Sequence, residues 1–245
     1  MTRIRRPLAA GGAILGLMLI VPTQAVAASG PGSRPAVPCP SFNAGAFHHS
    51  RTINNRNFPL DPGTRFTYQG SSRKAPVLDI VYVTHNTPTI DGVKTIEVRD
   101  QVFESGVLTE DTLDWYAQDD QGNVWYFGEF ATQLPAGTHD GSWTAGVNGA
   151  QPGYIMEAAP KVGDGYCQEN APGVAQDAAQ VLAVSTSRSV PWGSFSGNVL
   201  QTKDYSVIEP KNENKYYAPD VGMIEAISVT GPSEDIQLYT VEHGV

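Results

Sequence analysis

The sequence predicts an all-β protein that folds as a single antiparallel β-barrel or a strongly curved sheet. Short segments rich in β-branched and aromatic residues recur at regular intervals along the chain. Turn-forming residues such as Asp91-Gly92 and Ser105-Gly106 separate them, and the N-terminal half shows no capped helical periodicity. Evenly spaced strands without interleaved helices are typical of closed or strongly curved antiparallel sheets. We expect a calycin-like or lipoprotein-carrier-like architecture.

The beginning of the chain has the pattern of a secretory signal peptide, assigned to residues 1–27. Three arginines within residues 3–6 precede a short apolar run over residues 8–21, and Ala25-Val26-Ala27 is a typical cleavage signal. The apolar run is too short to span a bilayer comfortably, and no second long apolar run follows. We therefore expect a secreted protein without membrane insertion.

The remaining chain divides into an extension and one domain. Residues 28–56 begin with a stretch rich in Pro, Gly and Ser, which predicts a flexible N-terminal extension. No linker interrupts the strand pattern afterwards, so residues 57–245 are expected to form one β-barrel domain.

The charge of the protein excludes some partners. The full chain carries a formal net charge of −9, and the predicted signal peptide contains arginines but no acidic residue, so the mature chain is more acidic still. An acidic surface without a basic stripe argues against nucleic acid and anionic membranes as partners.

The two cysteines, Cys39 and Cys167, fit an oxidising compartment. We expect them to form a disulfide that ties the extension to the middle of the domain; the alternative is two free buried thiols. The sequence contains no CxxC, no HExxH and no cluster of Cys and His, so neither a metal site nor a cofactor is predicted. His48 and His49 are neighbours, and side chains of neighbouring residues in an extended segment point to opposite sides.

Twelve segments are expected to be strands, and the four between residues 77 and 130 should form a meander. Residues 174–185 begin with an Ala-rich stretch that would also suit a short helix, but β-branched residues follow and favour a strand. Residues 145–165 are rich in Gly and Pro and are expected to form a crossing loop. The expected strands are residues 64–70, 77–85, 93–103, 108–118, 123–130, 142–145, 166–169, 174–185, 194–204, 215–218, 222–230 and 236–242, with a launching turn over residues 57–64.

The densest aromatic segment, residues 114–129, is predicted to be a hairpin folded about residues 119–122. In that register Gln118 faces Asn123, Tyr116 faces Trp125 and Asp114 faces Phe127. One face would then be apolar and face the core. The other would alternate aromatic and hydrogen-bonding side chains, as either a ligand-facing wall or the outer face of an ordinary hairpin.

Several motifs resemble those of a family of uncharacterised bacterial exported proteins with a single β domain. The resemblance covers about residues 57–232 and implies an exported β protein, but it carries no activity to transfer. Where that family is expected to have a basic residue after Tyr166, this chain has Cys167. The motifs that carry the resemblance are residues 58–64, 114–129, 141–147, 160–164, 168–169, 172–177 and 215–219.

The sequence is compatible with three classes of function. The first is a secreted β-barrel that binds a small molecule, an apolar metabolite or a glycan, in an aromatic-lined cavity, because aromatic walls supply burial and stacking while polar groups fix orientation. The predicted ligand-binding residues are Tyr116, Gln118, Asn123, Trp125, Phe127, Trp143 and Tyr154.

The second class is an extracellular enzyme of the lyase, cyclase or glycosidase type. Carboxylates beside aromatic rings can acquire raised pKa values, and two of them can divide acid and base roles. The candidate catalytic residues are Glu129, Glu169 and Asp177. The third class is an interaction protein of the cell envelope with a flat exposed aromatic patch. Catalysis predicts acids that converge at one cavity, whereas binding predicts an aromatic cavity with few facing carboxylates.

Overall fold

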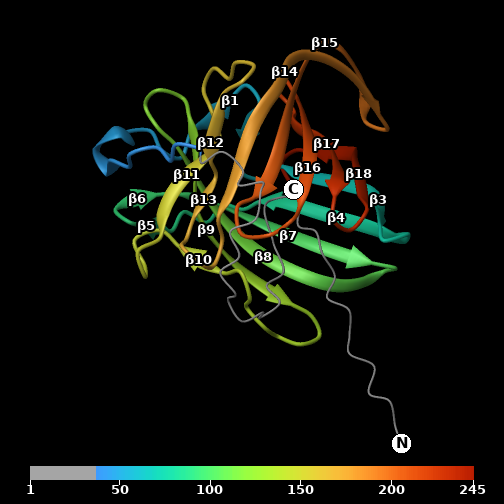
Figure 1. Cartoon of the computed structure of the whole chain (residues 1–245), viewed down its shortest axis with the longest axis horizontal. Helices are drawn as coiled ribbons and strands as arrows, with labels where there is room; N and C mark the ends of the chain where they lie inside the picture. The colour runs from blue at the N-terminus through green and yellow to red at the C-terminus, as the bar shows by residue number, and fades with distance from the viewer. Residues whose placement is uncertain (1–36) are drawn as a thin grey trace, which may run out of the picture.

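The computed structural model describes residues 37–245, which form a nearly closed antiparallel barrel (Figure 1). The predicted signal peptide lies outside the described residues. Neighbouring strands follow the order β12-β14-β15-β16-β17-β18-β3-β4-β7-β8-β9-β11-β13, and β10 pairs with β9. The strands are β3 (Arg65–Ser72), β4 (Ala75–Val83), β7 (Ile96–Glu104), β8 (Val107–Gln118), β9 (Val124–Gln133), β10 (Trp143–Thr144), β11 (Gln151–Met156), β12 (Gly165–Cys167), β13 (Glu169–Asn170), β14 (Asp177–Val190), β15 (Gly193–Ser206), β16 (Asn212–Ala218), β17 (Gly222–Thr230) and β18 (Glu234–Glu242).

The sequence prediction of an all-β barrel is confirmed, and so is the meander, because β4, β7, β8 and β9 are successive neighbours. Residues 177–190 are strand rather than helix, as preferred. The crossing loop predicted over residues 145–165 is wrong in part, because it contains β11. Gly153 in β11 allows the strand to pack closely against the segment of β12 and β13, because a Cβ at this position would lie 2.4 Å from the Cys167 carbonyl oxygen.

One short segment closes the barrel. β12 pairs with β14, β13 pairs with β11, and only Gln168 separates β12 from β13. The two ends of the long sheet therefore meet within residues 165–170, which leaves little free edge there.

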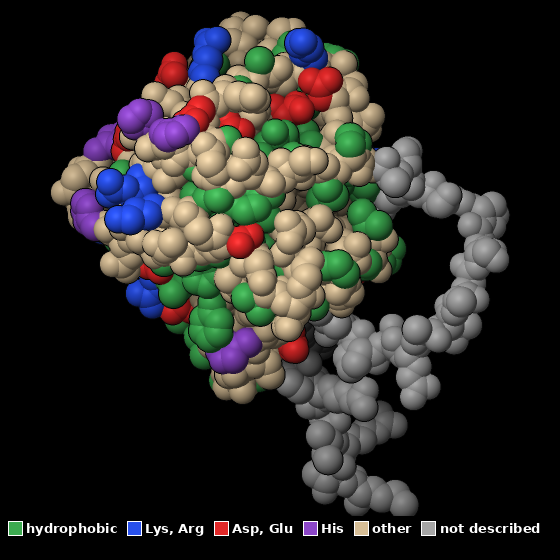
Figure 2. Space-filling view, turned by 90° about the vertical axis from the view of Figure 1, so that its left-hand side faces the viewer, with side chains coloured by type: hydrophobic (Ala, Val, Ile, Leu, Met, Phe, Trp, Pro, Cys, Tyr) green, Lys and Arg blue, Asp and Glu red, His purple; other side chains and the backbone are tan. Residues whose placement is uncertain are grey.

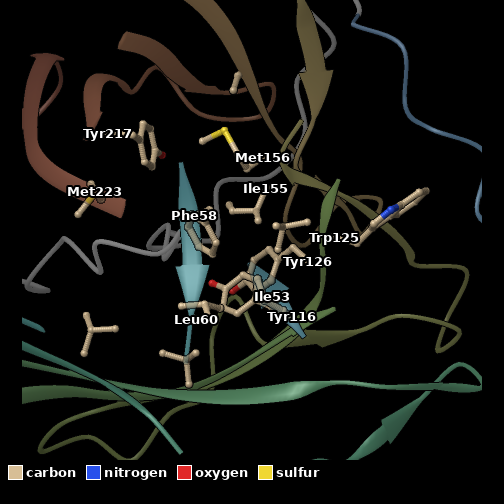
Figure 3. Packing of buried hydrophobic residues seen from close by; sticks show 14 of the residues in the cluster. Ile53, Phe58, Leu60, Tyr116, Trp125, Tyr126, Ile155, Met156, Tyr217 and Met223 are labelled. Carbon is tan, nitrogen blue, oxygen red and sulfur yellow. The ribbon is translucent and has the colours of Figure 1, made fainter. Parts of the chain in front are cut away.

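Inside the barrel lies a small hairpin of β1 (Ile53–Asn55) and β2 (Phe58–Leu60). Ile53, Phe58 and Leu60 are almost fully buried, and the Phe58 ring packs 5.4 Å from that of Tyr116. Figure 3 shows these side chains between Tyr217 and Met223 on one side and Tyr116 and Tyr126 on the other. The hairpin thus fills the apolar part of the barrel with side chains.

The β8–β9 hairpin is present, but its predicted register is wrong by one residue. Ala117 faces Trp125 and Tyr116 faces Tyr126, because the Asp119 side chain accepts hydrogen bonds from the backbone of Gln121 and Asn123 and enlarges the turn. A bulge follows, where Trp115 pairs with Gly128. Gly128 has φ 128°, and a Cβ there would lie 2.3 Å from the carbonyl oxygen of Trp143.

The N-terminal segment is attached to the outer face of this hairpin. A Cys39–Cys167 disulfide forms, as predicted. Later in this segment come Phe42, the 3₁₀ turn η1 (Ala44–Ala46) and Phe47. The ring centres of Phe42 and Phe47 lie 5.6–6.0 Å from those of Trp125 and Phe127. The predicted extension is thus described only from residue 37, and this part covers β9. A separate two-stranded sheet, β5 (Thr89–Ile90) with β6 (Val93–Lys94), lies nearby on the same side of the molecule (Figure 1).

Candidate functional site

Buried carboxyl groups gather on the inner side of the barrel. Strand alternation places Glu110, Asp114 and Tyr116 of β8 on one face, and the neighbouring strands add further acids at inward positions. All of these carboxyl groups have little or no exposed surface. The acids are Asp79 on β4, Asp100 on β7, Glu110 and Asp114 on β8, Glu129 on β9, Glu169 on β13 and Asp177 on β14.

Tyr126 links two of these acids. Its hydroxyl oxygen lies 2.5 Å from Asp114 Oδ1 and 2.9 Å from Glu129 Oε2. A phenol carries one proton, so it donates one of these hydrogen bonds and accepts the other from a protonated carboxyl group. At least one of Asp114 and Glu129 is therefore a neutral acid in this arrangement.

The candidate acids Glu129, Glu169 and Asp177 form a second connected group. Burial raises the pKa of Glu129 well above its usual range, and the nearby Glu169 carboxyl raises it further. Burial is also the main reason for the raised pKa of Glu169, followed by Asp177. Burial raises the pKa of Asp177 to about 7, against the opposing effect of Lys211. The structure thus places Glu169 close enough to raise the pKa of Glu129, and Asp177 close enough to raise the pKa of Glu169.

Asp79, Asp100 and Glu110 were not singled out by the sequence. Burial raises the pKa of Asp79, and the neighbouring Asp100 carboxyl adds to the shift. Burial raises the pKa of Glu110 to about 8, again with Asp100 as the next cause. A signal was present in the sequence: Asp79 lies midway between Val77 and Val81, at an inward position of a strand whose other inward residues are apolar.

A buried cation lies elsewhere in the barrel. The Lys215 ammonium group is 3.2 Å from Asp204 Oδ2 and 3.1 Å from Glu213 Oε1. These two carboxylates raise the pKa of Lys215 against the effect of burial, so the amine stays charged. Its charge is already satisfied by this pair of acids.

A cavity with room for a small molecule lies between β9, β10, the loop that precedes β11 and the loop between β13 and β14. Its volume is about 240 Å³. We call it the β9–β10 cavity; its walls are Glu129, Phe130, Ser142, Trp143, Thr144, Val147, Asn148, Ala150, Ala171, Pro172 and Val174. Trp143 also donates its indole N–H to Glu169 Oε1 at 3.2 Å, which connects the wall to the buried acids. Figure 2 views the side of the molecule that carries β10 and β11, where hydrophobic side chains are exposed among uncharged ones and most charged side chains lie along the upper and left edges.

The apolar interior beside the β1–β2 hairpin offers much less space. A cavity of about 30 Å³ remains there, lined by Phe58, Tyr68, Tyr217 and Met223 among others. This volume suits about one water molecule.

The predicted ligand-binding residues are distributed over several environments. Trp143 lines the β9–β10 cavity. Tyr116 is buried and stacks on Tyr126 with ring centres 4.9 Å apart. Trp125 and Phe127 are buried beneath Phe42 and Phe47, and the half-buried Tyr154 ring stands edge-on to Trp125.

The two polar residues predicted to contact a ligand, Asn123 and Gln118, instead form hydrogen bonds within the hairpin and with neighbouring segments. Asn123 donates to Asp119 Oδ2 and accepts from the backbone N–H of Ala158. Gln118 accepts from the backbone of Asn55 and donates to Asn54, at the edge of a shallow hollow that also contains His48 and Asp120. Of the predicted site, Trp143 and Glu129 are thus the residues that the structure brings together at the cavity.

Residues 37–245 contain no group of three or more His, Cys, Asp or Glu side chains arranged to hold a metal ion. No helix within these residues is long and apolar enough to cross a bilayer.

No protein family model matches the sequence, and no curated protein matches it. Among solved structures, the chain is similar to a "putative exported protein with YmcC-like fold" from Bacteroides fragilis, with 11% identity and a TM-score of 0.46. It is also similar to a "putative lipoprotein" from Parabacteroides distasonis, with 12% identity and a TM-score of 0.41. Each likeness covers 77% of this chain and 99% of the other. Identities of this size concern the fold and carry no information on function.

The fold defines the class of protein. It is an all-β protein with a nearly closed antiparallel barrel and one disulfide, Cys39–Cys167. Disulfides of this kind persist in oxidising compartments outside the cytoplasm.

Proposed function

We propose that this protein binds a small molecule with apolar faces, an apolar metabolite or a sugar ring, in the β9–β10 cavity. The observation that carries the proposal is the combination of Trp143 and Glu129 in the walls of one cavity of about 240 Å³. Ligand sites are typically concave and apolar, with a few polar groups that fix orientation. Phe130, Val147 and Val174 supply apolar wall, while Ser142, Asn148 and Glu129 supply hydrogen-bonding groups.

The location of the cavity also supports the proposal. Phe130 and Val147 remain 44% and 51% exposed, so the walls include apolar surface that the fold itself does not cover. By contrast, the aromatic rings of Trp125 and Phe127 already have partners in Phe42 and Phe47.

A thermal-shift screen against metabolites and sugars tests the proposal, because a ligand that binds only the native state raises the melting temperature. Val174→Trp would fill the cavity with a large ring and is expected to abolish the shift produced by each hit. Val107→Trp places the same ring at an exposed position at the start of β8 and should leave the shifts intact. Hits that bind Val174→Trp as well as they bind the wild-type protein would rule out this cavity as their site.

The second candidate function is an enzyme that uses the same cavity for acid and base catalysis. It is favoured by the coupling of Glu129 with Glu169 and of Glu169 with Asp177, since catalytic acids often have pKa values raised by burial and like charge. In this reading Glu129 contacts the substrate and Glu169 adjusts its protonation. Mass spectrometry of each screening hit after prolonged incubation would reveal turnover, and Glu169→Gln should abolish that turnover while binding persists. Hits that are recovered unchanged would leave binding as the function.

A further inference from the structure

The β9–β10 cavity has an unbalanced charge. Glu129 carries the one ionisable side chain among its described lining residues, and no Lys, Arg or His lines it. The groups that most affect Glu129 are the acids Glu169, Asp114 and Glu110, together with the Tyr126 hydroxyl. None of them supplies a positive charge.

The aromatic walls have the complementary property. The faces of Phe130 and Trp143 present the negative end of their ring quadrupoles, which attracts cations most strongly where water is excluded. One face of Phe130 is covered by the His139 ring, at 4.4 Å between ring centres, and 44% of the Phe130 side chain is still exposed. A compact cation in this cavity would contact aromatic rings and face a carboxyl group without a counter-ion.

We propose that the ligand of the β9–β10 cavity is a small organic cation, an amine or quaternary ammonium compound with compact apolar substituents. This inference rests on the proposed function: it keeps the β9–β10 cavity as the ligand site and assigns it a cationic ligand in place of a neutral metabolite or a sugar. When the cation enters, the Glu129 carboxyl group releases its proton to solvent and the carboxylate pairs with the positive charge. The walls Val147, Ala150, Ala171 and Val174 accommodate the apolar substituents.

The proposal fixes the direction of the pH dependence. Protons compete with the cation for the Glu129 carboxylate, so affinity should fall as the pH falls. The groups that face Glu129 are Tyr126 on the same strand, Asp114 and Glu110 on β8, and Glu169 on β13. His139, which stacks on Phe130, would add repulsion when protonated, and a His139→Gln variant separates its effect from that of Glu129.

Isothermal titration calorimetry with choline and with its uncharged isostere 3,3-dimethyl-1-butanol tests this inference. We expect choline to bind at least about tenfold more tightly than the alcohol. Titrations in two buffers with different ionisation enthalpies should show release of up to about one proton per choline and none for the alcohol. Equal affinity for the two compounds, or choline binding without proton release, would overturn the proposal.

Variants test whether choline binding and proton release take place in the β9–β10 cavity. Glu129→Gln should reduce choline affinity at least about tenfold and abolish proton release. Glu157→Gln is the matched control, because burial also raises the pKa of Glu157 to about 7 but this residue does not line the cavity. If Glu129→Gln fails to fold, the exposed Phe130→Ala should still weaken choline binding more than alcohol binding. Retained choline affinity in Phe130→Ala or Glu129→Gln contradicts the inference.

The same titrations separate this inference from the broader proposal. Sugars or neutral metabolites that bind the wild-type protein and lose binding in Val174→Trp, while choline and simple alkylamines do not bind, would refute the cation and leave the cavity as a ligand site. If no charged or neutral compound binds in the cavity, both proposals fail.

Discussion

At the scale of single residues, the barrel keeps carboxyl groups protonated by removing them from water. Burial raises the pKa of Glu110 from its ordinary value of 4.5 to about 8, and it raises the pKa of Glu234 to about 8 as well. The charged form of a carboxyl group is costly to bury without a partner, so the proton becomes part of the folded structure.

This gives the protein an unusual dependence of stability on pH. Because these acids have a higher pKa when folded than when unfolded, the stabilisation is fully present below about pH 4.5 and is lost as the pH rises through about 8. Each such proton contributes at most about 1.4 kcal/mol per pH unit to the slope. We expect the urea midpoint of unfolding to be higher at pH 5 than at pH 8.

A single substitution isolates the contribution of one protonated carboxyl group to this pH dependence of stability. Glu110→Gln imitates the neutral acid, so the midpoint should depend less steeply on pH in that variant. Glu242→Gln changes an exposed glutamate of the barrel and should keep the wild-type slope. A wild-type midpoint that is equal or higher at pH 8 would show that these carboxyl groups are not held neutral.

The candidate acids could be identified by residue type and local context, but their proximity could not. Glu129 and Glu169 are forty residues apart in sequence, and they come close because β11 pairs with β9 on one side and with β13 on the other. The acids of β4 and β7 were missed because an acid at an inward position also fits a solvent-facing strand until the barrel is seen to close.

At the scale of secondary-structure elements, most strands could be predicted because turn residues and alternation are local signals. The register of the β8–β9 hairpin could not. It depends on the Asp119 side chain, which binds the backbone of Gln121 and Asn123, and on the bulge at Gly128, which accommodates the backbone of Trp143. As a result, the expected ligand wall divides between the two faces of the hairpin, with Tyr116 inside and Trp125 outside.

The N-terminal segment should depend on its disulfide. Closing a loop between residues 128 apart contributes roughly 4–5 kcal/mol in the chain-entropy model, so a Cys39→Ser/Cys167→Ser variant should unfold at a clearly lower urea concentration. Phe42 lies three residues from Cys39, so its contact with Trp125 should loosen and tryptophan emission should shift to the red. Phe42→Ala with the disulfide intact separates the ring contact from the covalent tether. An unchanged unfolding midpoint after reduction of the wild-type protein would contradict this role.

At the scale of the whole molecule, the barrel closes where two backbones approach over Gly153. A Cβ at this position would lie 2.4 Å from the Cys167 carbonyl oxygen and 2.5 Å from that of Gln168. These contacts join β11 to the segment of β12 and β13 across one intervening loop. No local pattern in the sequence marks this pairing, and for that reason closure could be expected only as a class of fold. The sequence did not indicate which strands would meet.

Gly153→Ala should therefore weaken the closure of the barrel, that is, the contact between β11 and the segment of β12 and β13. We expect faster hydrogen–deuterium exchange at the amides of β11 and β13, together with a lower melting temperature, because the added methyl group forces the two backbones apart. Gly193→Ala serves as the control, since its Cβ would meet only the Phe195 ring at ordinary contact distance. Exchange rates in β11 that match those of the wild-type protein would show that this closure tolerates a side chain at position 153.

The position of a bound ligand tests the central claim most directly. A crystal structure of the protein with the tightest compound from the thermal-shift and calorimetric screens should show that compound in the β9–β10 cavity, against Trp143 and beside Glu129. Ligand density on Trp125 and Phe127 after displacement of Phe42 and Phe47, or inside the barrel in place of the β1–β2 hairpin, would contradict it.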